Sequence, residues 1–239
     1  MKFLVESSSR RGSIDIWNAF MVKDATFTEN DIPICESTDT TPDSVISFVE
    51  AKSIYQKEMR NNPDFKDSRF VHFYIDDQKF DGEKTGIWYQ PWKAMKMLNH
   101  FKGIITPDFS TNCDFPYPLK IWNTYRMRAF GCWSRKQGLE VINNVRWGTE
   151  ETWDYCFDGI PKGSIVSVGT VASGLQRVAN RNLFSRGFEQ MIKVIEPSTV
   201  IIYGSSNLPV IVKATEFGTK IISFPSETSL YFKGEKCHE

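Results

Sequence analysis

Short hydrophobic segments alternate with amphipathic segments along most of the chain after residue 43. Seven of these segments are short, rich in β-branched and aromatic residues, and bounded by turn-forming residues, which predicts strands. They span residues 44–50, 69–77, 103–109, 140–147, 164–170, 199–205 and 220–226.

The segments between these strands have apolar residues at three- and four-residue steps, which predicts helices. The clearest helix contains Leu183, Phe184, Phe188, Met191, Ile192 and Ile195, and Pro197 ends it. Another begins at Pro91, where a proline suits the first helical turn, and is expected to include Phe101 and to end at Gly103. A third helix is expected over residues 117–137.

Strands that alternate with helices indicate a mainly parallel sheet with helices outside it. We expect a single α/β domain over residues 43–239, with a (β/α) barrel-like arrangement because the strands are short and evenly spaced. An open doubly wound sheet is the alternative. Residues 1–42 have an irregular pattern with scattered aromatic residues, and we expect this segment to pack on the domain.

The composition is that of a globular protein, with 41% hydrophobic and 24% charged residues. The 29 basic and 29 acidic residues balance, so the total charge predicts no nucleic-acid partner. Residues 120–147, however, contain six basic residues and only one acidic residue. This run is either a solvated helix face or a local field that attracts a phosphate or carboxylate.

Five cysteines are widely spaced, at positions 35, 113, 132, 156 and 237, and no CxxC motif occurs. An odd number with such spacing predicts free thiols and a reducing compartment, so we expect a cytoplasmic protein. The three histidines have no metal-ligand spacing, and no metal site is expected. The N-terminal apolar run is too short for a signal peptide, and no segment is long enough to span a membrane.

Polar residues gather at the carboxyl ends of the predicted strands, which is the edge where both barrels and doubly wound sheets bind ligands. Asp76, Asp77 and Asp108 are the candidate catalytic residues there, with Asp108 as acid, base or orienting carboxylate. The candidate ligand-binding residues are Arg126, Asn144, Arg146, Trp147, Thr170, Tyr203 and Ser205. In the alternative interpretation, Asp108 and Ser110 cap the next helix.

Arg126 lies on the apolar side of the predicted helix 117–137, between Trp122 and Trp133, whereas Arg128 and Arg135 point toward solvent on a helical wheel. A buried guanidinium needs a partner, and Asp108, which comes just before this helix, is the natural candidate. The pair is either structural or the floor of an anion-binding cleft.

Three other features give weaker indications. The small residues of GTVASG, 169–174, are able to expose backbone N–H groups to a phosphate, but the segment lacks the P-loop lysine. Cys156 has no histidine nearby and is expected to be a buried thiol. Trp147 and Trp153 either stack on a nucleobase or belong to the core.

The segments IWNTYRMRAFG, VINNVRW, CFDGIPKGSIVSVGT and IIYGS together resemble the "domain of unknown function" family numbered forty-four seventeen, over most of the chain from residue 31 to KIISF. The matching positions are Asp76, Asp77, Asp108, Phe109, Ser110, Pro118, Trp122, Asn123, Arg126, Arg128, Gly131, Asn144, Trp147, Thr170, Tyr203 and Gly204. INNVRW and GTVASG depart from the family pattern. The resemblance implies occurrence on phages and other mobile elements, and it implies no activity.

Two functional hypotheses follow from these residues. The first is an enzyme that acts on a nucleotide, a nucleic acid or another phosphorylated ligand at the carboxyl ends of the strands. The second is a binding protein that captures a small anionic ligand or a host protein without chemistry. Convergence of Asp76, Asp77 and Asp108 favours metal-assisted chemistry, whereas an Asp108 neutralised by Arg126, with the other two carboxylates pointing outward, favours binding or a structural role. The cofactor and the oligomeric state are not predicted.

Overall fold

The computed structural model describes residues 15–171 and 173–232. Its centre is a sheet of seven strands, and every neighbouring pair of strands is parallel. The strands are β1 (Val45–Ser47), β2 (Asp67–His72), β3 (Phe101–Ile105), β4 (Glu140–Asn144), β5 (Ile165–Gly169), β6 (Thr199–Tyr203) and β7 (Lys220–Phe224). Each of the seven segments predicted from the sequence therefore overlaps one strand.

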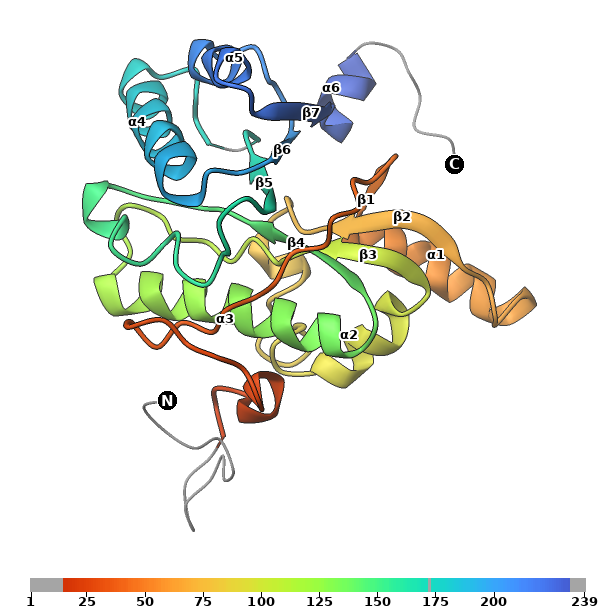
Figure 1. Cartoon of the computed structure of the whole chain (residues 1–239). Helices are drawn as coiled ribbons and strands as arrows, with labels where there is room; N and C mark the ends of the chain where they lie inside the picture. Colours follow the sequence, from red (N-terminus) through yellow and green to blue (C-terminus); the bar gives the residue numbers. More distant parts are fainter. Residues whose placement is uncertain (1–14, 172, 233–239) are drawn as a thin grey trace.

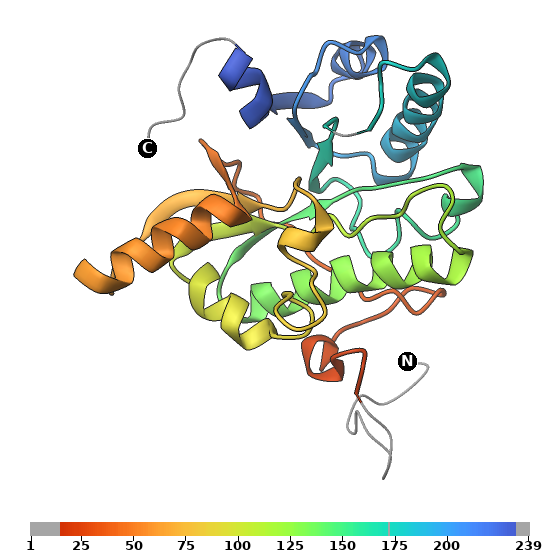
Figure 2. The same ribbon diagram turned by 180° about the vertical axis from the view of Figure 1, so that it is seen from behind.

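Helices follow most of the strands and cover one side of the curled sheet (Figure 1, Figure 2). The α-helices are α1 (Phe48–Asn61), α2 (Pro91–Leu98), α3 (Tyr117–Lys136), α4 (Val178–Ile195), α5 (Pro209–Glu216) and α6 (Glu227–Phe232). Short 3-10 helices occur at η1 (Ala19–Val22), η2 (Asp77–Lys79) and η3 (Glu150–Thr152). Within the described part of the chain, no helix combines the length and the apolar character needed to cross a membrane.

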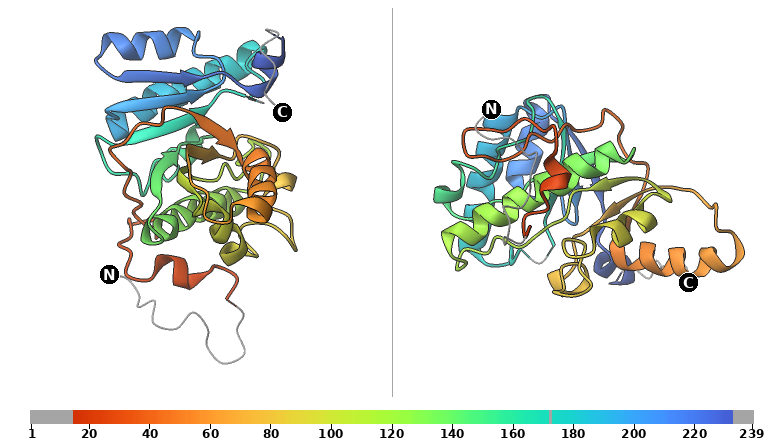
Figure 3. Two further views of the ribbon diagram at one scale, coloured as in Figure 1. Left: turned by 90° about the vertical axis from the view of Figure 1, so that its right-hand side faces the viewer. Right: turned by 90° about the horizontal axis from the view of Figure 1, so that it is seen from below.

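The strand order confirms the barrel-like prediction. The strands follow one another from β1 to β7 without a reversal, and the sheet curls into a half-barrel. A doubly wound sheet reverses its strand order at a switch point, so that alternative is wrong. Figure 3 shows the curl from two further directions, with α4 and α5 at one end and α1 and α2 at the other.

The two faces of the sheet have different cores. On the convex face, one apolar cluster joins β2–β4 to α1, α2 and α3, and a second joins β5 and β6 to α4 and α5. The concave face has a smaller cluster formed by Phe70, Tyr74, Ile105, Ile142, Ile165, Ile201 and Tyr203. Alternate residues of each strand point to opposite faces, so the nearly continuous apolar strands bury both.

The described part of the N-terminal segment packs against α3 and then fills a split in the sheet (Figure 1). β4 and β5 pair only at Asn143–Val166 and Asn144–Ser167. Where these strands diverge, the Thr38 N–H donates to the carbonyl oxygen of Val141, 2.7 Å away, in place of a strand partner. The irregular segment thus satisfies backbone groups that the split leaves open.

One predicted boundary is wrong. The helix that begins at Pro91 ends at Leu98, so Phe101 and Gly103 belong to β3 and not to the helix. A Cβ on Gly103 would lie 2.4 Å from the Glu140 carbonyl oxygen of β4. Close approach between two strands therefore requires this glycine, and the same residue type also ends helices, which explains the error.

Local sequence signals fix other helix ends. Ser47 and Glu50 form a reciprocal capping box at the start of α1. α4 ends as predicted, with Glu196 in the left-handed conformation directly before Pro197. Local residues therefore specify the start of α1 and the end of α4.

Candidate functional site

A pocket of about 310 Å³ opens at the carboxyl ends of β4 and β5. Its walls come from the loop after β3, the end of β4, the loop after β5 and the first turns of α4. The lining residues are Asp108, Thr111, Asn112, Cys113, Asn144, Val145, Arg146, Trp147, Val168, Gly169, Ser173, Gly174, Leu175, Asn180, Leu183 and Phe184. Asp108, Asn144, Arg146 and Trp147 are the predicted site residues that meet here.

Asp108 is held by two donors in the wall of this pocket. One carboxylate oxygen accepts a hydrogen bond of 2.8 Å from Asn144 Nδ2, and the other lies 2.6 Å from Arg146 Nη1. The Asp108 side chain is 13% exposed and the Arg146 side chain 33%. Burial raises the pKa of Asp108 above its ordinary value, although Arg146 and Asn144 oppose that shift.

Asn144 is fixed by contacts on all of its polar groups. Its side-chain oxygen lies 3.0 Å from the Tyr74 hydroxyl, and its backbone N–H donates to Thr106 Oγ1. Its carbonyl accepts from Arg128 Nη1 at 2.9 Å. Since Nδ2 donates to Asp108, the orientation of the amide is set by its surroundings, and Asn144 holds Asp108 in one position.

Tyr74 supports this arrangement from the concave face. Its hydroxyl is also 2.7 Å from Ser167 Oγ, and its ring stacks on Tyr203 at 5.3 Å between centroids. A Cβ on Gly169 would lie 2.6 Å from the Tyr74 ring. The glycine at the end of β5 therefore makes room for the ring that orients Asn144.

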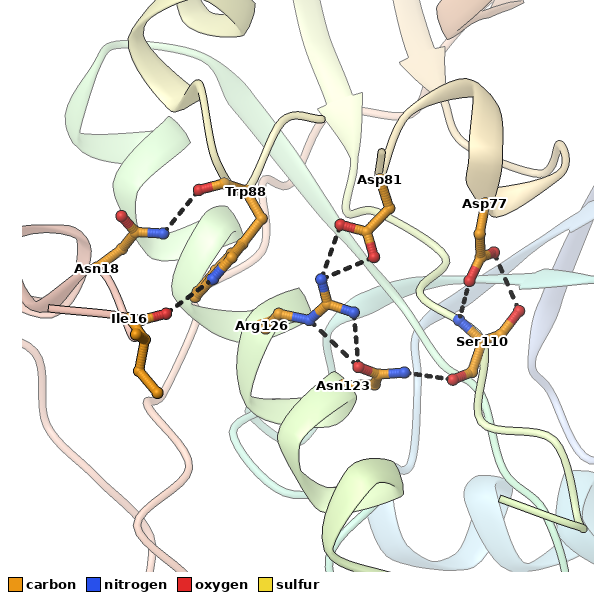
Figure 4. Close-up of polar contacts among 8 residues, drawn as sticks. All are labelled: Ile16, Asn18, Asp77, Asp81, Trp88, Ser110, Asn123 and Arg126. Atoms are coloured by element: carbon orange, nitrogen blue, oxygen red, sulfur yellow. Dashed lines mark hydrogen bonds and ion pairs between the residues drawn. The ribbon is translucent and has the colours of Figure 1, made fainter. Parts of the chain in front are cut away.

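Arg126 is buried as predicted, but the predicted pairing with Asp108 is wrong. Its Nη1 contacts both carboxylate oxygens of Asp81 at 2.8 Å, and its Nε and Nη2 donate to Asn123 Oδ1 (Figure 4). The guanidinium also lies 3.8 Å from the centre of the Phe109 ring. In the loop after β3, the Asp108 side chain extends toward β4 and the Phe109 side chain toward α3. Arg126 of α3 therefore contacts Phe109 and not Asp108.

The two sides of the loop after β3 are therefore held by separate networks. On the α3 side, Asp77 accepts hydrogen bonds from the backbone N–H and hydroxyl of Ser110, and Asn123 Nδ2 donates to the Ser110 carbonyl (Figure 4). On the pocket side, Asn144 and Arg146 hold Asp108. Together they fix the position of Asp108 without making Arg126 a pocket residue.

The three predicted catalytic carboxylates serve different contacts. Asp108 faces the pocket, Asp77 binds Ser110, and the Asp76 side chain is 82% exposed near Lys79. Among residues 15–171 and 173–232, no group of three or more His, Cys, Asp or Glu side chains is placed to hold a metal ion. The arrangement that would favour metal-assisted chemistry is thus not formed by these acids.

Thr170, Tyr203 and Ser205 share the strand-end edge but do not line the pocket. The Thr170 hydroxyl lies 3.3 Å from the Tyr203 carbonyl oxygen and 3.0 Å from that of Ser205, so it links the ends of β5 and β6. The Tyr203 ring lies on the concave face against His72 and Tyr74. Trp147 lines the pocket and also packs on Phe184, so it belongs in part to the core, and stacking on a nucleobase stays a prediction.

The basic run of residues 120–147 is not an exposed patch. Arg128 was expected to face solvent, and this is wrong, since it is fully buried and donates to the carbonyl oxygens of Asn144, Cys156 and Asp158. Lys120 is also buried, with Glu151 as its partner. Arg135 and Lys136 are exposed at the end of α3. A helical wheel finds one apolar side, but α3 is covered on nearly all sides between its first and last turns.

Several pocket residues were not predicted from the sequence, namely Thr111, Asn112, Ser173, Asn180, Leu183 and Phe184. The one available signal was the stretch of small residues at 169–174, whose Gly169, Ser173 and Gly174 do line the pocket. Leu183 and Phe184 had been assigned to the core side of α4. Both side chains also line the pocket, because the pocket lies against the first turns of α4.

The described cysteines are free thiols. Cys35, Cys132 and Cys156 are buried and Cys113 is exposed, while Cys237 lies outside the described residues. Burial raises the pKa of Cys156 to about 12, which suits an unreactive core thiol.

Comparison with known proteins identifies the family of this chain. The model of the family "Domain of unknown function (DUF4417)" matches residues 25–225. The chain is similar to the Gene 1 protein of Mycobacterium phage L5, with 29% identity over 199 residues that cover 82% of this chain and 80% of that protein. It is also similar to the Gene 1 protein of Mycobacterium phage D29, with 32% identity over 134 residues that cover 56% of this chain and 48% of that protein. No solved structure matches the chain significantly. The match over 25–225 covers most of the 239 residues, and the chain therefore belongs to the DUF4417 family.

Proposed function

We propose that this chain is a binding protein that holds a small anionic ligand in the pocket beside Arg146. The observation that carries the proposal is the partly exposed Arg146 guanidinium in the pocket wall, which uses one nitrogen for Asp108. Guanidinium groups in partly dry clefts bind carboxylates and phosphates through their remaining N–H groups.

Asp108 is best explained as the residue that positions Arg146. A carboxylate that accepts from Asn144 and Arg146 is neutralised within the protein, so it does not repel an anion as a free carboxylate would. Tyr74 holds Asn144 and Asn144 holds Asp108, so these hydrogen bonds restrict the conformations that Arg146 adopts beside Asp108. Preorganisation of this kind lowers the entropy that binding costs.

A second function, an enzyme acting on a nucleotide or another phosphorylated ligand, is favoured by one observation. Burial raises the pKa of Asp108, and a carboxyl group with a raised pKa in a cleft is suited to donate or accept a proton. In that case Asp108 exchanges a proton with the ligand while Arg146 holds its anionic group. Nucleic acid as the ligand is less well supported, because the basic run of α3 is largely buried.

The cellular setting is part of the proposal. Four free thiols suit a reducing compartment such as the cytoplasm. Relatives encoded by two mycobacteriophages suit a protein of phages and other mobile elements. Capture of a host protein instead of a small ligand would use a surface other than this pocket.

Mass spectrometry of small molecules that are retained by the purified protein tests the binding role. We expect an anionic compound that is lost from Arg146→Gln and kept by Arg60→Gln, which removes an exposed arginine at the end of α1. The same compound released unchanged indicates binding, whereas Asp108-dependent conversion of the compound indicates the enzyme. Retention that is equal in both arginine variants would contradict the role of Arg146.

A further inference from the structure

Thr111 lines the pocket with an unsatisfied polar group. The residue is 4% exposed, and its hydroxyl has no hydrogen-bond partner among the residues described. A buried hydroxyl without a partner costs on the order of 1–3 kcal/mol. Because Thr111 lines the pocket and its hydroxyl has no protein hydrogen bond to lose, a ligand oxygen in the pocket is a suitable partner for it.

Arg146 offers further donors to the same space. A guanidinium has five N–H groups. The Arg146 side chain contacts Asp108 through Nη1 and has no other polar partner in the described part of the protein. The planar fork suits the oxygens of a phosphate or carboxylate.

The start of α4 supplies the third group of donors. α4 has 18 residues, and its first turn has neither a side-chain cap nor an acidic residue. Ser173 and Gly174 precede this turn and Asn180 lies in it, and all three line the pocket. The uncapped N–H groups and the positive end of the helix favour an anion. Arg177 and Arg181 at the same turn are exposed and raise the local positive potential.

The arrangement of these donors favours a phosphomonoester over a carboxylate. They come from three elements, namely the loop after β3, the end of β4 and the start of α4, and so approach the pocket from different directions. A carboxylate has two oxygens in one plane, whereas a phosphomonoester has three peripheral oxygens arranged around a tetrahedral phosphorus. The phosphomonoester is therefore the better match to the donors.

The apolar wall and the volume limit the rest of the ligand. Trp147, Leu183 and Phe184 form one side of the pocket, where a flat or apolar group is able to pack. A volume of about 310 Å³ is at the lower end of the range for small-molecule pockets, which favours a small ligand. We infer that the ligand is a phosphomonoester with a flat body no larger than a nucleoside, and this inference rests on the binding role proposed above. Thr111, Arg146 and the start of α4 hold its phosphate.

Calorimetric titration of the full chain with matched probes tests this inference. The probes are inorganic phosphate, phenyl phosphate, benzoate, and the four common ribonucleoside 5′-monophosphates with their parent nucleosides. We expect phenyl phosphate to bind at least tenfold more tightly than benzoate, and at least one monophosphate to bind at least tenfold more tightly than its nucleoside. Absence of binding by every phosphate probe would refute the inference.

Variants of Thr111 separate a ligand contact from a structural role. Thr111→Val should weaken the binding of the best phosphate probe about tenfold, the effect of one hydrogen bond to a charged group. It should not lower the free energy of unfolding, because the hydroxyl has no partner in the protein. Thr111→Ser keeps the hydroxyl and should restore binding. Undiminished phosphate affinity in Thr111→Val would overturn the assignment of this residue.

The two proposals fail in different ways. If benzoate binds as tightly as phenyl phosphate and Arg146→Gln removes both, the site takes small anions and the assignment to phosphomonoesters is wrong. If Arg146→Gln and Arg60→Gln bind every probe equally well, the proposed function is wrong as well.

Discussion

Replacement of Arg126 by methionine tests whether the Arg126–Asp81 pair stabilises the loop after β3. The two side chains are 9% and 13% exposed, and Nη1 contacts both carboxylate oxygens at 2.8 Å. Methionine keeps much of the packing of the aliphatic stem but leaves the Asp81 carboxylate without its partner. Loss of one partner of a buried pair costs on the order of 3–5 kcal/mol in free energy of unfolding.

Chemical denaturation of three variants measures this cost. Arg135→Met is the matched control, because Arg135 is an exposed arginine of the same helix, and it should change stability by no more than about 0.5 kcal/mol. Arg126→Met combined with Asp81→Asn should be more stable than Arg126→Met alone, since the stranded charge is removed. Equal and small losses in Arg126→Met and Arg135→Met would show that the pair contributes nothing.

The loss should also depend on pH. Burial raises the pKa of Asp81, and Arg126 opposes that shift, so removal of Arg126 raises this pKa further. A raised carboxyl pKa means that the folded state binds the proton more tightly than the unfolded state. Stability then falls as the pH rises from the unfolded pKa of about 3.9 through the folded one. The deficit of Arg126→Met should therefore be larger at pH 7 than at pH 4, and a constant deficit would contradict this origin.

Three further predictions concern other parts of the fold. Arg128→Met leaves the carbonyl oxygens of Asn144, Cys156 and Asp158 without their donor. It should lower the free energy of unfolding by roughly 2–4 kcal/mol in denaturant titration. A loss as small as that of Arg135→Met would contradict the burial of Arg128. Gly169→Ala places a methyl group 2.6 Å from the Tyr74 ring and should lower the unfolding free energy by about 1–3 kcal/mol, and a stability equal to that of the natural chain would mean that the ring moves without cost. In a Cys237→Ser background, native protein should react rapidly with a thiol reagent at Cys113 alone, because Cys35, Cys132 and Cys156 are buried. Rapid reaction that persists after Cys113→Ser would show that a buried thiol is accessible.

Much of the architecture follows from local patterns in the sequence. The seven strands, the end of α4 before Pro197 and the proline start of α2 were all predicted, because hydrophobic periodicity and backbone restrictions act within a few residues. The parallel, barrel-like order was predicted too, since each strand is separated from the next by a helix-length connection. The misplaced end of α2 arose because Gly103 has a non-local role that a local pattern does not reveal.

The candidate site was predicted only as an edge of the sheet. Asn144 ends β4, while Asp108 follows β3 and Arg146 and Trp147 follow β4, and the parallel sheet brings the ends of these strands together. Thr111, Asn180 and Phe184 could not be assigned, because the direction in which a loop folds back over a strand end depends on what it packs against. Thr170 and Tyr203 lie at the predicted edge, but their contacts hold β5, β6 and the concave face together.

The partners of the arginines were decided by tertiary structure alone. The helical wheel correctly placed Arg126 on a buried side, yet its partner is Asp81, 45 residues earlier, and not the nearby Asp108. The same wheel placed Arg128 in solvent, but the chain around Cys156 and Asp158 folds over this side of the helix and covers it. Amino-acid sequence alone determined where strands and helices form, because those choices depend on neighbouring residues. Which charge meets which depended on the paths of the loops, because an ion pair requires two side chains within about 4 Å whatever their separation along the chain.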